Sequence, residues 1–170
     1  MAFIRVFIHG LESTSQGAKG QYFRARYPDM MIGDYEGPLE NRMAKLGREL
    51  DGKKNLILVG SSFGGLMAAI HTCQYPETVR RLILLAPALS LPDFEPYAGC
   101  AVKTPVILFH GRGDDVVPFP PVQAIARKVF ANLEYNLVDD DHSLHKTFPG
   151  MHWNELLLFP DRENSQADKG

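Results

Sequence analysis

The residues best suited to chemistry lie in segment 60–64, Gly-Ser-Ser-Phe-Gly, between an apolar run and a helical pattern. Its G-x-S-x-G spacing is typical of a nucleophile elbow, a sharp strand-to-helix turn that presents a serine hydroxyl and leaves no room for a Cβ at either flanking glycine. The same spacing makes Ser62 the predicted nucleophile, because Ser61 would need a glycine at position 59, which is Val59. A dinucleotide-binding loop is excluded, since Ser62 stands where G-x-G-x-x-G requires its second glycine. The alternative left open is that Ser62 only caps the following helix.

An elbow serine needs a base and an acid, which follow it in the chain order Ser, Asp or Glu, His. The apolar run 105–110 leads to Asp114 and Asp115, and the run 134–138 leads to His142. All three groups then follow strands and lie on the same rim of a parallel sheet. Taken alone, the carboxylates could serve a turn or a helix cap, and His142 could be an exposed loop residue.

A loop near the start of the chain could supply an oxyanion donor. The run FIRVFI ends in His9-Gly10-Leu11. In an elbow enzyme, one donor is a backbone N–H from such a loop and the other belongs to the residue after the nucleophile. These positions predict Leu11 and Phe63 as the donors, whereas His9 is interpreted as a packed or hydrogen-bonded loop residue.

The positions of these residues depend on an alternation of strands and helices. The apolar runs are continuous, as in parallel strands covered on both faces, and lie at Phe3–Ile8, Leu56–Val59, Leu82–Leu85 and Val106–Phe109, with weaker candidates at Met30–Ile32 and Tyr135–Val138. Helices are expected from Pro38, from Pro121, and from the elbow to Tyr75-Pro76. This alternation predicts an α/β sheet that binds ligands beyond the carboxyl ends of its strands.

Composition narrows the class of protein. The chain has 170 residues, a net charge of -2, 45% hydrophobic and 22% charged residues. A single domain over residues 1–160 with a polar tail at 161–170 is expected. No basic block favours nucleic acid, no apolar run approaches the roughly 20 residues of a membrane span, and the N-terminus lacks the features of a signal peptide. Two cysteines, Cys73 and Cys100, are expected to be reduced, which favours the cytoplasm.

Taken together, four segments resemble the α/β-hydrolase superfamily, and in particular its small, lidless YqiA-like esterases. The segments are HGLESTSQGAK at 9–19, GSSFGG at 60–65, HGRGDDVVP at 110–118 and DDDH at 139–142. The resemblance spans about residues 3 to 160 and implies that the triad acid is Asp114 and the triad base His142. It further implies a minimal α/β-hydrolase fold: a mostly parallel sheet of about six strands, helices on both faces and no lid domain, because segment 86–104 is only 19 residues long. The cleft should then be shallow and open.

These observations predict a serine hydrolase that cleaves a small acyl ester or thioester through an acyl-enzyme, without a metal or an organic cofactor. The rim residues Leu11, Glu12, Phe94, Tyr97, Val117 and Leu144 are candidates for the substrate pocket. Two alternatives stay open. One is a metal site, because His142, His145 and His152 lie near Asp139–Asp141; the other is a non-catalytic binding or scaffold protein on a hydrolase fold. Nothing in the sequence decides the substrate or the oligomeric state.

Overall fold

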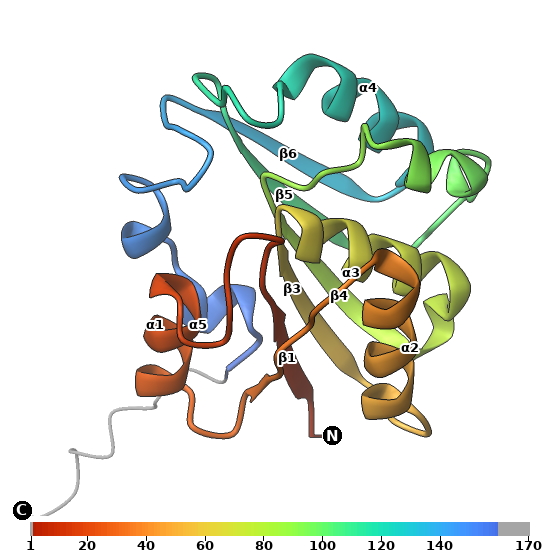
Figure 1. Cartoon of the computed structure of the whole chain (residues 1–170), viewed down its shortest axis with the longest axis vertical. Coiled ribbons are helices and arrows are strands. Elements are labelled where there is room, and N and C mark those ends of the chain that lie inside the picture. The colour runs from red at the N-terminus through yellow and green to blue at the C-terminus, as the bar shows by residue number, and fades with distance from the viewer. Residues whose placement is uncertain (1, 160–170) are drawn as a thin grey trace, which may run out of the picture.

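A computed structural model describes residues 2–159, which are built around a six-stranded sheet (Figure 1). Every pairing in the sheet is parallel, and the strand order is β2-β1-β3-β4-β5-β6. The strands are β1 (Ile4–Ile8), β2 (Met31–Ile32), β3 (Leu56–Ser61), β4 (Val79–Leu85), β5 (Val106–Gly111) and β6 (Leu133–Val138). Because all six run the same way, their carboxyl ends form one rim.

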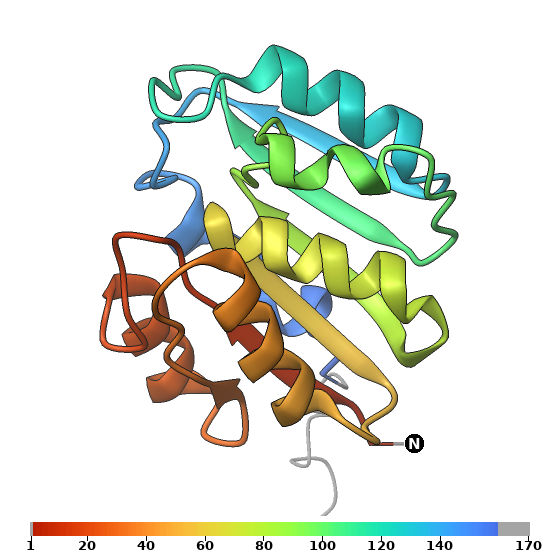
Figure 2. The same cartoon turned by 45° about the vertical axis from the view of Figure 1, so that its right-hand side comes forward.

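Helices cover both faces of the sheet. They are α1 (Ala18–Arg26), α2 (Leu39–Leu50), α3 (Phe63–Gln74), α4 (Phe119–Val129) and α5 (Trp153–Leu156), with short 3-10 helices η1 (Pro76–Thr78), η2 (Pro92–Tyr97) and η3 (Phe148–Gly150). Figures 1 and 2 show α2, α3 and α4 on one face and α1 and α5 on the other. The described residues contain no helix long and apolar enough to cross a membrane.

Alternate strand residues fill two separate cores. In β3, Leu56 and Leu58 pack toward α2, α3 and α4, whereas Ile57 and Val59 pack toward α1 and α5. All four side chains are fully buried, as expected for a central strand with both faces covered. On the α1 face the rings of Phe23 and Trp153 meet edge to face, with their centroids 4.7 Å apart.

The expected fold is confirmed: about six strands, a parallel sheet, helices on both faces and no lid. The connection from β4 to β5 contains only η2. Two details differ from the expectation. The helix expected to begin at Pro121 begins at Phe119, with Pro118 as its N-cap. Pro120 and Pro121 lie in its first turn, where a proline is tolerated because the N–H it lacks would have no partner within the helix. Helix α1 was not expected at all, since its sequence shows little apolar periodicity and buries only Gly20 and Phe23. The predicted tail at 161–170 lies outside the described residues.

Candidate active site

The turn between β3 and α3 is a strained strand-to-helix turn centred on Ser62. Ser62 stands between the two elements with φ 56° and ψ −115°, a region that side-chain-bearing residues rarely adopt. Its hydroxyl makes no capping hydrogen bond to α3, so the capping alternative gains no support. Such outliers often mark functional sites. Two further residues at this rim, Ala86 after β4 and Leu144, also have positive φ.

The two glycines of the motif are required because main-chain atoms of neighbouring segments lie where a Cβ would stand. A Cβ on Gly60 would stand 2.4 Å from the carbonyl oxygen of Gly64. A Cβ on Gly64 would stand 2.1 Å from the carbonyl oxygen of Ile8. Neither backbone can move away without disturbing the sheet, so both positions require glycine.

His142 connects Ser62 to a carboxylate. Its Nε2 lies 3.0 Å from Ser62 Oγ, and its Nδ1 lies 2.7 Å from Asp114 Oδ2. A carboxylate only accepts, so the Nδ1 proton is donated to Asp114 and Nε2 is left free to accept the Ser62 hydroxyl proton. The structure therefore brings together the three residues singled out from the sequence, from the rim ends of β3, β5 and β6.

Of the two adjacent carboxylates, Asp114 faces His142 and Asp115 faces solvent. The second oxygen of Asp114 is also occupied: Oδ1 accepts hydrogen bonds from the N–H groups of Val116 and Val117. The Asp114 carboxylate is thus fixed from both sides, with Oδ2 directed at the imidazole.

A second histidine, His110, lies behind Asp114 and is completely buried. Its Nε2 donates to the Val117 carbonyl oxygen at 2.7 Å and lies 3.2 Å from Asp114 Oδ2. Burial lowers the pKa of His110, and the Val117 carbonyl and Asp114 oppose this only in part. In the sequence, His110 is only the first residue of the segment that contains Asp114, and nothing in the pattern shows that its ring turns inward.

The loop that carries His142 is organised by the buried carboxylate of Asp140. It accepts hydrogen bonds from the backbone N–H groups of Asp141, Lys146 and Thr147. Burial alone would raise the pKa of Asp140, but hydrogen bonds from Thr147 and the neighbouring backbone lower it below its ordinary value. The loop is also held from outside, since Lys19 Nζ donates to the Ser143 carbonyl oxygen at 2.7 Å.

Two backbone amides near Ser62 have no acceptor among the described residues. Phe63 is the first residue of α3, where an N–H has no partner within the helix. The Leu11 N–H, in the loop after β1, also has no acceptor among the described residues. This loop lies close to Ser62, since a Cβ on the neighbouring Gly10 would stand only 3.4 Å from Ser62 Cβ. His9 is buried and structural, as expected: its Nδ1 donates to the Gly10 carbonyl oxygen and its Nε2 accepts from Tyr35 N–H.

Comparison with known proteins agrees with the fold described above. A family model described as the alpha/beta hydrolase fold matches residues 13–99, about half of the chain and including the elbow. The chain belongs to the α/β-hydrolase-fold family. A cis-3-alkyl-4-alkyloxetan-2-one decarboxylase from Shewanella oneidensis is 36% identical to this α/β hydrolase over 66 residues, which is 36% of this chain and 21% of that protein. The match thus spans about a fifth of that relative's length.

Solved structures share the fold of this α/β hydrolase at low identity. An esterase from Exiguobacterium antarcticum superposes with a TM-score of 0.73 at 14% identity, covering 92% of this chain and 91% of the other. A putative hydrolase from Agrobacterium vitis gives 0.71 at 19% identity, with 91% and 87% covered. The Est1E protein from Butyrivibrio proteoclasticus, solved with ferulic acid bound, gives 0.68 at 15% identity, with 93% and 88% covered.

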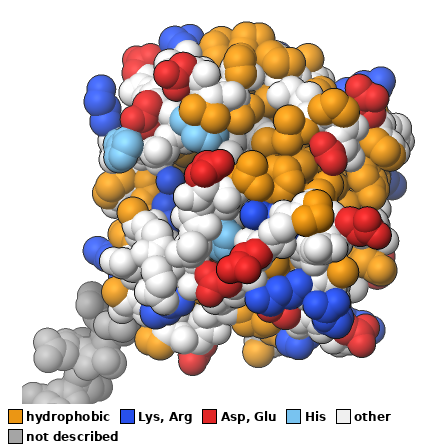
Figure 3. All heavy atoms as spheres, viewed as in Figure 1, with side chains coloured by type: hydrophobic (Ala, Val, Ile, Leu, Met, Phe, Trp, Pro, Cys, Tyr) orange, Lys and Arg blue, Asp and Glu red, His pale blue; other side chains and the backbone are white. Residues whose placement is uncertain are grey.

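The predicted pocket residues of this α/β hydrolase fall into two groups. Leu11 and Glu12 are exposed, and Tyr97 is half-buried, with its hydroxyl accepting a hydrogen bond from Gln74. Phe94, Val117 and Leu144 are instead buried in the two cores. Phe94 and Leu144 are 1% and 0% exposed, so their side chains offer almost no surface to a substrate. Hydrophobic surface gathers over the upper and right-hand part of the face in Figure 3.

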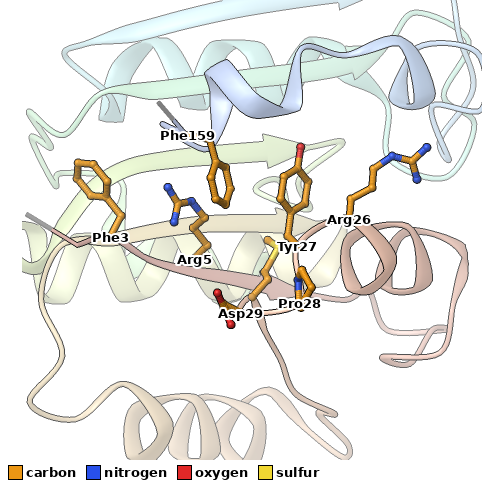
Figure 4. A pocket seen from close by; sticks show the side chains of 8 residues that line it. Phe3, Arg5, Arg26, Tyr27, Pro28, Asp29 and Phe159 are labelled. Carbon is orange, nitrogen blue, oxygen red and sulfur yellow. The ribbon is translucent and has the colours of Figure 1, made fainter. Parts of the chain in front are cut away.

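Two other places bear on ligand binding: the histidines near Asp141 and a cavity at the amino ends of the strands. Among residues 2–159 no three His, Cys, Asp or Glu side chains lie where they could hold one metal ion, and His145 is engaged with Asp141, whose pKa it lowers to about 2. A cavity of about 100 Å³ lies at the amino ends of β1 and β2 (Figure 4), on the opposite edge of the sheet from Ser62. There the Arg5 guanidinium donates to the Leu157 and Leu158 carbonyl oxygens and stacks on Phe159, which is a packing role.

Proposed function

We propose that the protein is a serine hydrolase that cleaves a small acyl ester or thioester through Ser62, His142 and Asp114. The observation that carries the proposal is the continuous series of contacts from Asp114 Oδ2 to His142 and from His142 Nε2 to Ser62 Oγ. Membership of a family that contains hydrolases and esterases supports it. The reaction needs no metal or organic cofactor.

In the proposed reaction, Ser62 Oγ attacks the substrate carbonyl carbon while His142 Nε2 takes the hydroxyl proton. The imidazolium that forms is stabilised by Asp114, which also keeps the ring in the required tautomer. The Leu11 and Phe63 N–H groups donate to the oxyanion, assisted by the positive end of α3. His142 then gives its proton to the leaving oxygen or sulfur, and the bond to the leaving group breaks. A water molecule, deprotonated by His142, hydrolyses the acyl-Ser62 ester and regenerates the hydroxyl.

The surroundings of Ser62 favour ester and thioester substrates with small acyl groups. The β4–β5 connection contains only η2, so no helical lid covers the carboxyl ends of the strands. The absence of such a cover favours an open site over a closed tunnel. The free thiols of Cys73 and Cys100 agree with a cytoplasmic location, which we include in the proposal.

Labelling with a fluorophosphonate probe tests the proposal, because only an activated serine reacts with it. The wild-type protein and Ser61→Ala should label, and Ser62→Ala should not. Ser61 is the matched control, since it is adjacent in the chain but ends β3 rather than forming the turn. Equal labelling of Ser62→Ala, or no labelling of the wild type, would reject the proposed nucleophile. Release of 4-nitrophenol from short acyl esters should follow the same order.

A further inference from the structure

Arg42, in the first turns of α2, is a buried cation without a counterion. The residue is 5% exposed, and no carboxylate among the described residues forms an ion pair with it. Its Nε donates to the Gly37 carbonyl oxygen at 2.8 Å. Its Nη1 is enclosed and has no hydrogen-bond partner. Buried charges in proteins are normally paired, so an unpaired guanidinium in this position needs an explanation.

The guanidinium lies beside the residue that directly follows the proposed nucleophile. Its central carbon is 5.3 Å from the centre of the Phe63 ring, and Phe63 directly follows Ser62. The ring face attracts the positive charge but accepts no hydrogen bonds in the plane of the guanidinium. The bond from Nε to Gly37 fixes the orientation of the group. The two Nη atoms, which form the outer edge of the fork, are left without acceptors.

The free donor of the guanidinium suits a carboxylate. A guanidinium forms strong, charge-assisted hydrogen bonds to a carboxylate, and none of the described residues accepts a hydrogen bond from Nη2. Because Nη1 is enclosed, a ligand would contact the group through Nη2. One unpaired cation balances one negative charge, which favours a single carboxylate over a doubly charged phosphate.

We propose that Arg42 binds a carboxylate carried by the substrate, at a distance from the reacting carbonyl. The natural substrate would then be an anionic acyl ester or thioester, such as a monoester of a dicarboxylic acid. This inference rests on the proposed function, because it deepens the description of the same site. A binding role for Arg42 can be told from a packing role by its effect on the free energy of unfolding. A packing residue stabilises the folded protein, whereas a residue retained for binding lowers that stability.

Paired substrates of equal chain length test the charge preference. We would measure kcat/KM for the 4-nitrophenyl monoester of adipic acid and for 4-nitrophenyl hexanoate, which differ only in the terminal carboxylate. A second pair, 4-acetoxybenzoate and its methyl ester, places the charge on the leaving group. In the wild type at least one pair should favour the anion by about 10-fold or more. Arg42→Met and Arg42→Gln should reduce that ratio to about 1.

The control is Arg48→Gln, on the same helix but exposed, which should keep the wild-type ratio. Arg42→Lys keeps the charge but not the fork, and should retain only part of the preference. A ratio near 1 in the wild type for both pairs, or a ratio that Arg42→Met leaves unchanged, would overturn the inference. Hydrolysis of the neutral esters reports separately on the proposed function.

Two measurements do not depend on turnover. In the Ser62→Ala protein, monomethyl adipate should raise the melting temperature and dimethyl adipate should not, and Arg42→Met should remove the difference. In the absence of ligand, Arg42→Met should leave the melting temperature unchanged or raise it, because an unpaired buried charge is replaced by an apolar chain of similar length. If Arg42→Met markedly lowers the melting temperature, and monomethyl adipate does not raise that of the Ser62→Ala protein, then Arg42 is a packing residue and the binding role is refuted.

Discussion

Gly64 lies directly against the backbone of Ile8, so closely that a Cβ on Gly64 would stand 2.1 Å from the Ile8 carbonyl oxygen. This contact joins the first turn of α3 to the rim end of β1. The same approach places the loop after β1, with the Leu11 N–H, beside Ser62. The elbow and the proposed oxyanion loop are therefore one packing unit, and a change in either should move both.

Replacing Gly64 by alanine should remove activity and lower stability. The added methyl group must displace either β1 or α3, and overpacking of this kind typically costs about 1–3 kcal/mol. Gly47→Ala is the matched control, since a Cβ at Gly47 in α2 meets no atom within 4 Å. That variant should be stabilised by roughly 0.5–1 kcal/mol, as expected for alanine in a helix interior. Urea unfolding and ester turnover of both variants provide the check, and a fully active Gly64→Ala would contradict the packing argument.

The adjacent carboxylates Asp114 and Asp115 should differ sharply in their effect on turnover. Asp114→Asn removes the acceptor of the His142 Nδ1 proton and favours the wrong tautomer, which costs about 10⁴ in kcat in the serine protease that serves as the general example. Asp115 is exposed and makes no contact with His142. Asp115→Asn should therefore retain nearly full kcat. Steady-state kinetics with thermal melting of both variants test this, and a greater loss of kcat in Asp115→Asn would transfer the role to Asp115.

Short acyl esters should be better substrates than long ones. The β4–β5 connection, residues 86–105, contains no helix beyond η2, so nothing there encloses a long acyl chain. We expect kcat/KM for 4-nitrophenyl esters to be highest at short chain lengths and to fall beyond them. The series from acetate to palmitate is the measurement. A steady rise to palmitate, with activation at a lipid interface, would show that the site is enclosed.

Stability should fall as the pH drops below about 6.5, the ordinary pKa of histidine, in part because of His110. Burial lowers its folded-state pKa. Between the two pKa values the unfolded chain binds a proton that the folded protein does not, so acid favours unfolding, by at most about 1.4 kcal/mol per pH unit for one such group. His110→Gln should have a shallower decline over this window. His152→Gln, at an exposed position outside the ion pairs of the described residues, should follow the wild type in urea titrations from pH 7.5 to 5.0.

The strands and the strand-to-helix turn at Ser62 could be predicted from sequence because their signals are local. The apolar run before Gly60 reflects side chains buried on both faces of the sheet, and the glycine spacing around Ser62 reflects backbone contacts that leave no room for a Cβ. Helix α1 escaped prediction because it packs mainly through Phe23 and has no continuous apolar face. Its place in the fold depends on partners distant in the chain, such as Trp153.

The surroundings of the site were harder to predict than its centre. Phe94 lies in the short helix η2 and Leu144 in a loop; in such connections an apolar side chain can face either a pocket or the core, and both face the core. Arg42 was not singled out from the sequence, since charged residues in helices are usually exposed. Its burial follows from the approach of α2 to Phe63, which no local pattern records.

The position of Ser62 is set by main-chain hydrogen bonds to the neighbouring rim. Its N–H donates to the Leu85 carbonyl oxygen and its own carbonyl oxygen accepts from Ala88 N–H, while Ala86 N–H donates to Phe109. Such bonds do not depend on which side chains are present. Aliphatic residues of the cores can therefore be exchanged over many generations, or by an engineer, without moving the serine. Residues such as Arg42 can be altered independently of it, so new substrate ranges are accessible to this scaffold without rebuilding its reactive centre.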